Sequence, residues 1–88
     1  MEINAQIAQA MDQIIAKVFR KDEDYVAANH DLRFKEDLMA NSKQYFPIIA
    51  YFEEKFDIFM DYHVFQYSAI TIATAIEFVI NEYNTQKD

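Results

Sequence analysis

Ser42 is the residue of this 88-residue chain that is the strongest candidate for a functional side chain. It stands with Asn41 immediately before an apolar pattern of helical period, so its hydroxyl is predicted to lie at a helix N-terminus. Unpaired N–H groups and the positive end of the helix dipole meet there, and both favour a phosphate group. Alternatively, Asn41 or Ser42 could cap the helix with its side-chain oxygen. The residues alone therefore place the Ser42 hydroxyl at a helix start, where it or Asn41 is a candidate helix cap.

Other reactive side chains do not form a recognisable pattern. No serine, histidine and acid arrangement can be argued, because Ser42 and Ser68 are the only serines and neither has a base visible in the sequence. His30 and His63 lack a recognisable metal-ligand spacing. The chain has no cysteine and no glycine, which excludes thiolate sites, a thioester on the polypeptide itself, and glycine-rich phosphate loops. We therefore expect no bound metal and no enzymatic activity.

Four helices are predicted to hold Ser42 in place. Apolar residues recur at steps of three and four in the three longer segments, and the third segment is short. Asp61 and Thr71 are expected to cap the last two helices. Pro47 lies inside the second helix without an N–H to donate, which predicts a kink or a late helix start. The predicted ranges are about 2–19, 42–56, 61–66 and 71–83.

A long loop is predicted between the first two helices, with room for a short turn around residues 25–28. Leu32, Phe34 and Leu38 are expected to anchor this loop in the core. Without glycine, left-handed backbone must fall on other residues, and asparagine tolerates it best. The candidates are Asn29, Asn41 and Asn84.

Length and charge narrow the class of protein further. Residues 1–88 suffice for one domain with one core, which the fourteen Phe and Tyr side chains can fill. The net charge of −7 disfavours nucleic acid and anionic membranes and favours partners with basic surfaces. The longest apolar run of the chain, residues 46–52, is too short for membrane insertion. Glu2 follows Met1, whereas a secretory signal would begin with basic residues. We expect an acidic, cytoplasmic, monomeric all-α domain.

Two segments resemble a known family. Positions 37–43 read Asp-Leu-Met-Ala-Asn-Ser-Lys, and positions 53–58 read Glu-Glu-Lys-Phe-Asp-Ile. This layout resembles the acyl carrier protein family, whose signature is Asp-Leu-Gly-Ala-Asp-Ser-Leu followed by a helix ending in Glu-Glu-Phe-Asp-Ile or similar. The resemblance implies an acyl-carrier-like four-helix bundle with three longer helices, one short helix and a long first loop.

The resemblance also implies a function. The family's matching serine carries 4′-phosphopantetheine, a covalent group from coenzyme A, so Ser42 is the implied attachment site. Its thiol would hold acyl intermediates as thioesters, as in fatty acid or polyketide biosynthesis. The implied partners are a phosphopantetheinyl transferase and acyl-processing enzymes with basic docking surfaces. Four acids near the end of the second helix are the candidates for docking these partners or, equally, a solvated face: Glu53, Glu54, Asp57 and Asp61.

The chain departs from the family signature at three positions. Met39 replaces the glycine and removes the easy route to positive φ, Asn41 replaces an aspartate, and Lys43 replaces a leucine. An alternative interpretation is therefore a helical protein-interaction module with a carrier-like fold and an unmodified Ser42. A further alternative is a helical subunit that buries its Phe and Tyr surface in an oligomer.

Overall fold

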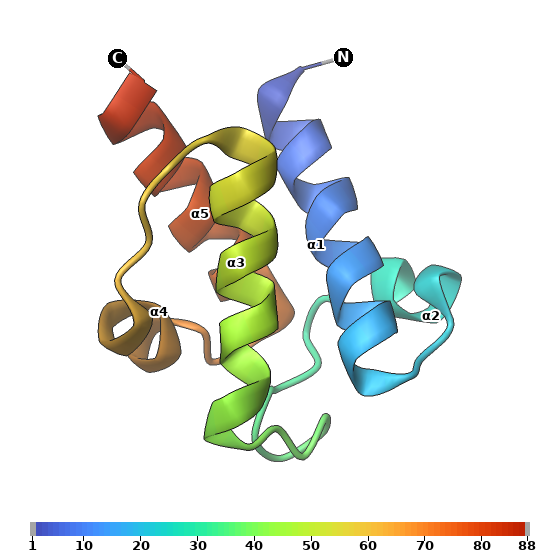
Figure 1. Cartoon of the computed structure of the whole chain (residues 1–88). Coiled ribbons are helices and arrows are strands. Elements are labelled where there is room, and N and C mark those ends of the chain that lie inside the picture. Colours follow the sequence, from blue (N-terminus) through green and yellow to red (C-terminus); the bar gives the residue numbers. More distant parts are fainter. Residues whose placement is uncertain (1, 88) are drawn as a thin grey trace.

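The chain folds as a bundle of helices in the computed structural model, which describes residues 2–87 (Figure 1). No β-strand occurs in these residues, so the predicted all-α class is confirmed. Met1 and Asp88, the ends of the predicted domain, lie outside the described residues. None of the helices in 2–87 combines the length and apolarity needed to cross a membrane. The elements are α1 (Ile3–Phe19), α2 (Glu23–Ala28), the 3-10 helix η1 (Ser42–Gln44), α3 (Tyr45–Phe56), α4 (Tyr62–Ser68) and α5 (Ile72–Lys87).

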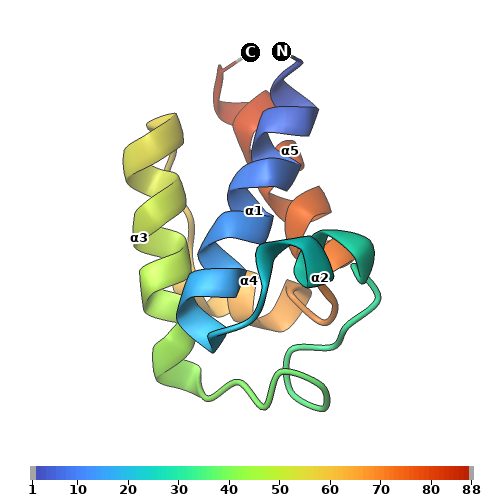
Figure 2. The same ribbon diagram turned by 90° about the vertical axis from the view of Figure 1, so that its right-hand side faces the viewer.

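The helix α1 is the centre of the packing, because it contacts α2, α3 and α5. In Figure 1, α3 runs down the front of the molecule between α4 and α1, and α5 lies behind it. The short helix α4 contacts both α3 and α5 and closes the side opposite α2. Both termini lie at one end of the bundle, and the N-terminal end of α3 lies at the other (Figures 1 and 2).

The first loop contains a helix, α2, so the prediction of four helices was wrong. Asp22 caps this helix by accepting from the backbone N–H of Asp24 at 2.8 Å. Val26 is fully buried, whereas its neighbours in α2 are exposed. One buried residue in six gives no helical period in the sequence, which is why the pattern indicated a loop.

The rest of the first loop is anchored as predicted. Phe34 is fully buried and Leu38 nearly so, while Leu32 packs partly buried against the core. The loop backbone also pairs with the segment before α5, since the N–H of Phe34 donates to the carbonyl of Ile70 at 2.9 Å and the N–H of Ile72 donates to Leu32 at 3.0 Å. The loop that leads to Ser42 is therefore part of the packed structure.

The second predicted helix begins late, as Pro47 required. Residues 42–44 form a 3-10 turn, and α3 itself starts at Tyr45. Pro47 is then the third residue of α3, within the first turn. The first turn is the part of a helix that tolerates proline best.

The last two helices have the predicted caps but extend further than predicted. Asp61 accepts from the N–H of Val64 at 3.0 Å, and the Thr71 hydroxyl accepts from the N–H of Thr74 at 3.1 Å. The helix α5 continues to Lys87 because its end has tertiary partners. Gln86 accepts from the N–H of Phe59 at 2.7 Å and donates to the carbonyl of the same residue at 2.6 Å.

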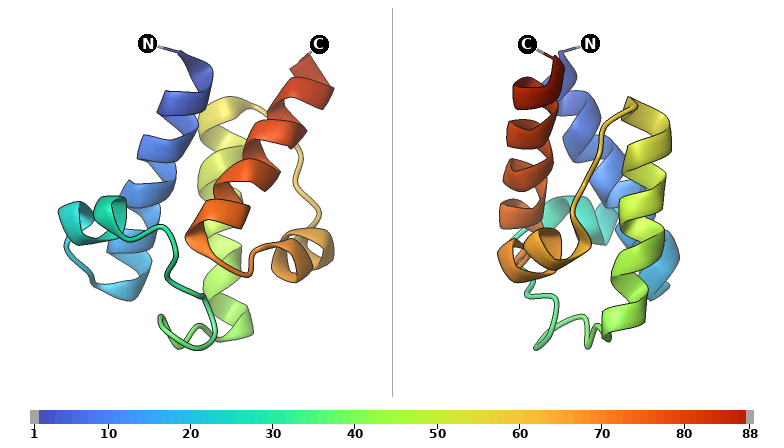
Figure 3. Two further views of the ribbon diagram at one scale, coloured as in Figure 1. Left: turned by 180° about the vertical axis from the view of Figure 1, so that it is seen from behind. Right: turned by 60° about the vertical axis from the view of Figure 1, so that its left-hand side comes forward.

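The contact between Gln86 and the backbone of Phe59 fixes the connection from α3 to α4, which runs back along the bundle in Figure 3. The Glu53 carboxylate accepts from the N–H of Met60 at 2.9 Å and holds the same connection from the α3 side. Sequence periodicity carries no information on such pairs, because Gln86 and Phe59 lie 27 residues apart.

Within residues 2–87, left-handed backbone occurs at three residues, none of which is an asparagine. Arg20 ends α1 with φ 56°, Asp57 ends α3 with φ 54°, and Met39 has φ 55° in the loop before η1. The expectation for asparagine was wrong: Asn29 has φ −136° and Asn41 has φ −104°, because both are used as helix caps in other conformations.

A chain of aromatic contacts crosses the core. The Phe34 ring lies 5.7 Å from Tyr45, which lies 6.1 Å from Phe65, which in turn stacks on Phe78 at 5.6 Å between ring centroids. These residues come from the first loop, α3, α4 and α5, so the chain links the elements around the start of α3. Aromatic pairs of this geometry contribute about 0.5–1.5 kcal/mol each beyond burial.

Candidate functional site

Ser42 is exposed at the first position of η1, and its hydroxyl has no hydrogen-bond partner within residues 2–87. The cap is Asn41, whose side-chain oxygen accepts from the N–H of Lys43 at 3.0 Å. Gln44 completes a capping box, because its Oε1 accepts from the N–H of Asn41 at 2.9 Å. The alternative role of Ser42 as the cap was therefore wrong, and its hydroxyl is available for another purpose.

The same capping box occupies most of the N–H groups that a phosphate would use. The N–H groups of Asn41 and Lys43 bind side chains, and that of Gln44 donates to the Asn41 carbonyl at 3.0 Å. The expected set of unpaired donors at this helix start is thus largely absent among the described residues. Positive charge is supplied instead by the exposed side chain of Lys43, directly beside the serine.

The loop before Ser42 has the backbone shape that glycine would favour. Met39 occupies the glycine position of the family signature and takes φ 55°, with 81% of its surface exposed. A left-handed non-glycine residue costs roughly 1–2 kcal/mol. The next residue holds this shape, since the N–H of Ala40 donates to the carbonyl of Phe34 at 2.8 Å.

Asp37 closes the turn in which this loop begins. Its carboxylate accepts from the backbone N–H of Arg33 at 2.8 Å and from the Arg33 Nε at 3.4 Å. The backbone hydrogen bond is the main reason that the pKa of Asp37 lies below its ordinary value; slight burial opposes it, and the guanidinium contributes further in the same direction. The first aspartate of the motif is thus a structural residue of the loop.

Apolar side chains surround the serine. The exposed Phe46 ring stacks on Tyr62 with 4.3 Å between centroids and 11° between planes. The Tyr62 hydroxyl donates to the carbonyl of Ser42 at 2.8 Å. With Met39 on the preceding loop, the surface near Ser42 is apolar, with one cation at Lys43.

Tyr45 lies beneath this surface with an unpaired hydroxyl. It is 1% exposed, and its oxygen is buried without a hydrogen-bond partner within residues 2–87. Burial, with a smaller contribution from the nearby Tyr62, raises the pKa of Tyr45 above its ordinary value. A buried hydroxyl without a partner costs roughly 1–3 kcal/mol.

Three of the four acids predicted to dock partners, Glu53, Glu54 and Asp57, lie toward the C-terminal end of α3, away from Ser42. The fourth, Asp61, precedes Tyr62, whose hydroxyl contacts the Ser42 carbonyl. Glu53 holds the N–H of Met60, Asp61 caps α4, and Asp57 pairs with Lys87 at 3.3 Å. Eleven residues separate Ser42 from Glu53, a rise of roughly 16 Å along the helix.

Glu54 differs from the other three acids because it is exposed on the shallow groove between α1 and α3. That groove also contains Ile14, Val18 and Pro47. The role of the four acids in docking stays a prediction.

The most buried charged residue was not predicted. Asp12 on α1 is 7% exposed, and its carboxylate lies 2.6 Å from Nε2 of His30. This pair joins α1 to the loop after α2, and no sequence pattern relates residues 18 positions apart. Within residues 2–87, no three His, Cys, Asp or Glu side chains gather to form a metal site.

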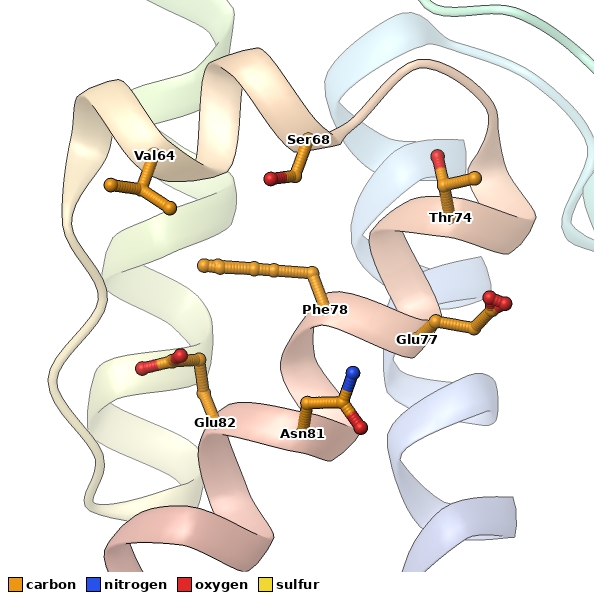
Figure 4. Close-up of a pocket in the computed structure, with 7 residues that line it drawn as sticks. All are labelled: Val64, Ser68, Thr74, Glu77, Phe78, Asn81 and Glu82. Atoms are coloured by element: carbon orange, nitrogen blue, oxygen red, sulfur yellow. The ribbon is translucent and has the colours of Figure 1, made fainter.

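Two of the grooves on residues 2–87 lie between pairs of helices. One is the shallow groove between α1 and α3, and the other lies between α4 and α5 (Figure 4). The second has a phenylalanine, Phe78, at its centre and two acids, Glu77 and Glu82, on the α5 side.

The fold and the site thus define an all-α helical bundle with an exposed serine at a helix start. No family model matches the chain, and comparisons with curated proteins and with solved structures found no match.

Proposed function

We propose that the protein is an acyl carrier, which holds acyl or related intermediates as thioesters on a 4′-phosphopantetheine arm attached to Ser42 and delivers them to partner enzymes. The observation that supports this most directly is the exposed and unpartnered hydroxyl of Ser42, since Asn41 performs the capping. The left-handed Met39 adds support, because the backbone turns at the position where the family has glycine.

The residues around Ser42 fit a phosphodiester. The Ser42 oxygen forms the bond to phosphorus as the pyrophosphate bond of coenzyme A breaks, adenosine 3′,5′-bisphosphate leaves, and the base of the transferase takes the serine proton. The Lys43 ammonium provides the opposite charge that the capping box no longer supplies through N–H groups. When bound, the arm supplies the thiol that this cysteine-free chain lacks. The modifying transferase supplies the base and the metal for attachment, so Ser42 requires no activating residue.

Partner recognition near Ser42 is proposed to rely on apolar contact. Met39 and Phe46 are the exposed large apolar side chains closest in sequence to Ser42, and Phe46 stacks on Tyr62, which contacts the Ser42 carbonyl. The acids expected to dock basic surfaces lie at the distant end of α3 and on α4, where they steer the approach of a basic partner.

Intact mass measurement tests the proposal. The protein is incubated with coenzyme A and a broad-specificity phosphopantetheinyl transferase, and one phosphopantetheine group is expected to add. The chain offers a matched control, because Ser42 and Ser68 are its only serines. Ser42→Ala is expected to abolish the adduct and Ser68→Ala to leave it in place. The carrier proposal fails if the wild type gains no mass while a control carrier is modified.

A non-carrying interaction module is the second candidate function. It is favoured by Lys43 and by the apolar surface around Ser42, which together form a contact surface that does not need a modified serine. In that case native protein purified from its source carries an unmodified Ser42. Mass measurement of native protein therefore distinguishes the two candidates.

A further inference from the structure

The groove between α4 and α5 is a second candidate binding site, separate from Ser42. Val64 and Ser68 on α4, and Phe78, Glu77 and Glu82 on α5, line this groove. In Figure 4, Phe78 and Glu82 extend toward the left, whereas Glu77 extends to the opposite side of α5. The figure shows the Phe78 ring extending toward α4, where it forms the floor between the two helices.

Apolar groups form the floor and one edge. Phe78 is partly buried and stacks on the fully buried Phe65 at 5.6 Å, which fixes its ring. Val64 is 52% exposed on the opposite wall. Phe59, on the connection from α3 to α4, is 68% exposed. Its backbone is hydrogen-bonded to Gln86, which also contacts Glu82. Exposed apolar groups held in place in this way favour contact with another molecule.

The charge around the groove has one sign. Residues 57–86 contain four acids and neither lysine nor arginine. Asp57 forms an exposed ion pair with Lys87 and Asp61 is used as a cap, whereas Glu77 and Glu82 have no cationic partner within residues 2–87. Glu82 accepts a hydrogen bond from the neutral amide of Gln86 at 3.0 Å. Two carboxylates without a cationic partner within residues 2–87 therefore border an apolar floor.

We propose that this groove binds a cationic amphipathic helix of a partner protein. Its apolar face contacts Phe78 and Val64, and its lysine or arginine side chains pair with Glu77 and Glu82. The two acids are five residues apart on α5, which separates them by roughly 7.5 Å along the helix and by about 140° around it, so the cations of the partner reach them from two sides. The site does not involve Ser42 and does not depend on its modification.

Binding of a model peptide tests this site. The probe is a labelled peptide of about 18 residues, five helical turns, with leucine on one face and lysine on the other. One control peptide has the same composition in scrambled order, and a second has glutamate in place of lysine. Fluorescence anisotropy gives affinities, and amide NMR shifts locate the contact. Shifts are expected at residues 64–68 and 77–82, with the amphipathic cationic peptide binding most tightly and less tightly as salt is added.

Charge reversal provides the sharper test. Glu77→Lys is expected to weaken binding about fivefold, because reversal replaces an attraction with a repulsion. Glu23→Lys, which makes the same charge change on α2 across the molecule, is expected to leave the affinity within about twofold. Val64→Ser should also weaken binding by removing apolar contact, and Ser42→Ala should not alter it. Circular dichroism of each variant verifies that the helices are retained.

Four outcomes would overturn the proposal. These are equal binding of the scrambled peptide, equal weakening by Glu77→Lys and Glu23→Lys, amide shifts confined to the α1–α3 groove, and self-association in sedimentation that protects residues 64–82. Each is independent of whether Ser42 is loaded, so failure of this inference leaves the carrier proposal to its own test.

Discussion

The hydroxyl of Tyr62 donates a hydrogen bond of 2.8 Å to the carbonyl oxygen of Ser42, twenty residues earlier in the chain. Tyr62 is the first residue of α4, and its ring also stacks on Phe46 of α3. The backbone of the candidate attachment residue is therefore held by α4 as well as by its own capping box. Movement of α4 and the position of Ser42 are coupled through this one side chain.

Removing this hydroxyl should loosen the start of η1 while keeping the aromatic stack. Tyr62→Phe is expected to lower the free energy of unfolding by about 0.5–1 kcal/mol. Urea denaturation measures the change. Tyr67→Phe is the matched control, because Tyr67 is 86% exposed and has no hydrogen bond from its hydroxyl within residues 2–87. Equal stability of both variants would show that water replaces the Tyr62 contact at no cost.

Asn41 and Ser42 should differ in their effect on stability. Asn41→Ala removes the cap and is expected to cost about 1 kcal/mol. Ser42→Ala should change the free energy of unfolding by no more than about 0.3 kcal/mol, since its hydroxyl binds nothing and its site is exposed. The two variants are compared by urea denaturation. A larger loss for Ser42→Ala than for Asn41→Ala would contradict the assignment of the cap.

Glycine at position 39 should stabilise the protein. Met39→Gly removes the steric cost of φ 55°, and the expected gain is about 1 kcal/mol. Ala40→Gly is the control at the next residue, which has no positive φ, and it should lose about 0.5–1 kcal/mol. Thermal and urea unfolding give both values. A lower free energy of unfolding for Met39→Gly would mean that the methionine side chain stabilises the protein by more than its backbone strain destabilises it.

Tyr45→Phe should stabilise the protein by about 1 kcal/mol at neutral pH, because it removes a buried hydroxyl that has no partner. The difference should grow in alkali. Burial raises the pKa of native Tyr45 above its ordinary value of 10.0, so above that pH the unfolded chain releases a proton that the native state retains. Wild-type stability therefore falls as the pH rises above 10.0, and Tyr45→Phe lacks this component.

Urea denaturation of wild type and Tyr45→Phe at neutral and alkaline pH measures both effects. Tyr67→Phe again controls for removal of an exposed hydroxyl. A difference between wild type and Tyr45→Phe that does not change with pH would contradict the raised pKa.

Helices with a complete apolar period could be predicted from the sequence. The first helix was expected at 2–19 and lies at Ile3–Phe19, and the roles of Asp61 and Thr71 as caps follow from their position before an apolar run. The helix α2 could not be predicted in the same way, because only Val26 of its six residues is buried.

The local chemistry at Ser42 was less predictable, although part of the signal was present. Asn41 followed three residues later by Gln44 is a capping-box spacing, and it identifies Asn41 over Ser42 as the cap. The contact from Tyr62 and the pairing of Asp12 with His30 depend on how distant segments pack. No local pattern specifies such contacts.

The left-handed residues Arg20, Met39 and Asp57 affect two opposing contributions to the stability of this glycine-free chain. These are the conformational entropy of the unfolded state and the backbone strain of the native state. A chain without glycine has fewer backbone conformations in the unfolded state, so it loses less conformational entropy on folding. The native state bears the opposing cost, because each of the three turns is made by a residue with a Cβ atom. Glycine at these positions would thus lower the strain of the native backbone and raise the conformational entropy that folding must overcome. The loop beside Ser42 would become more mobile as it became less strained.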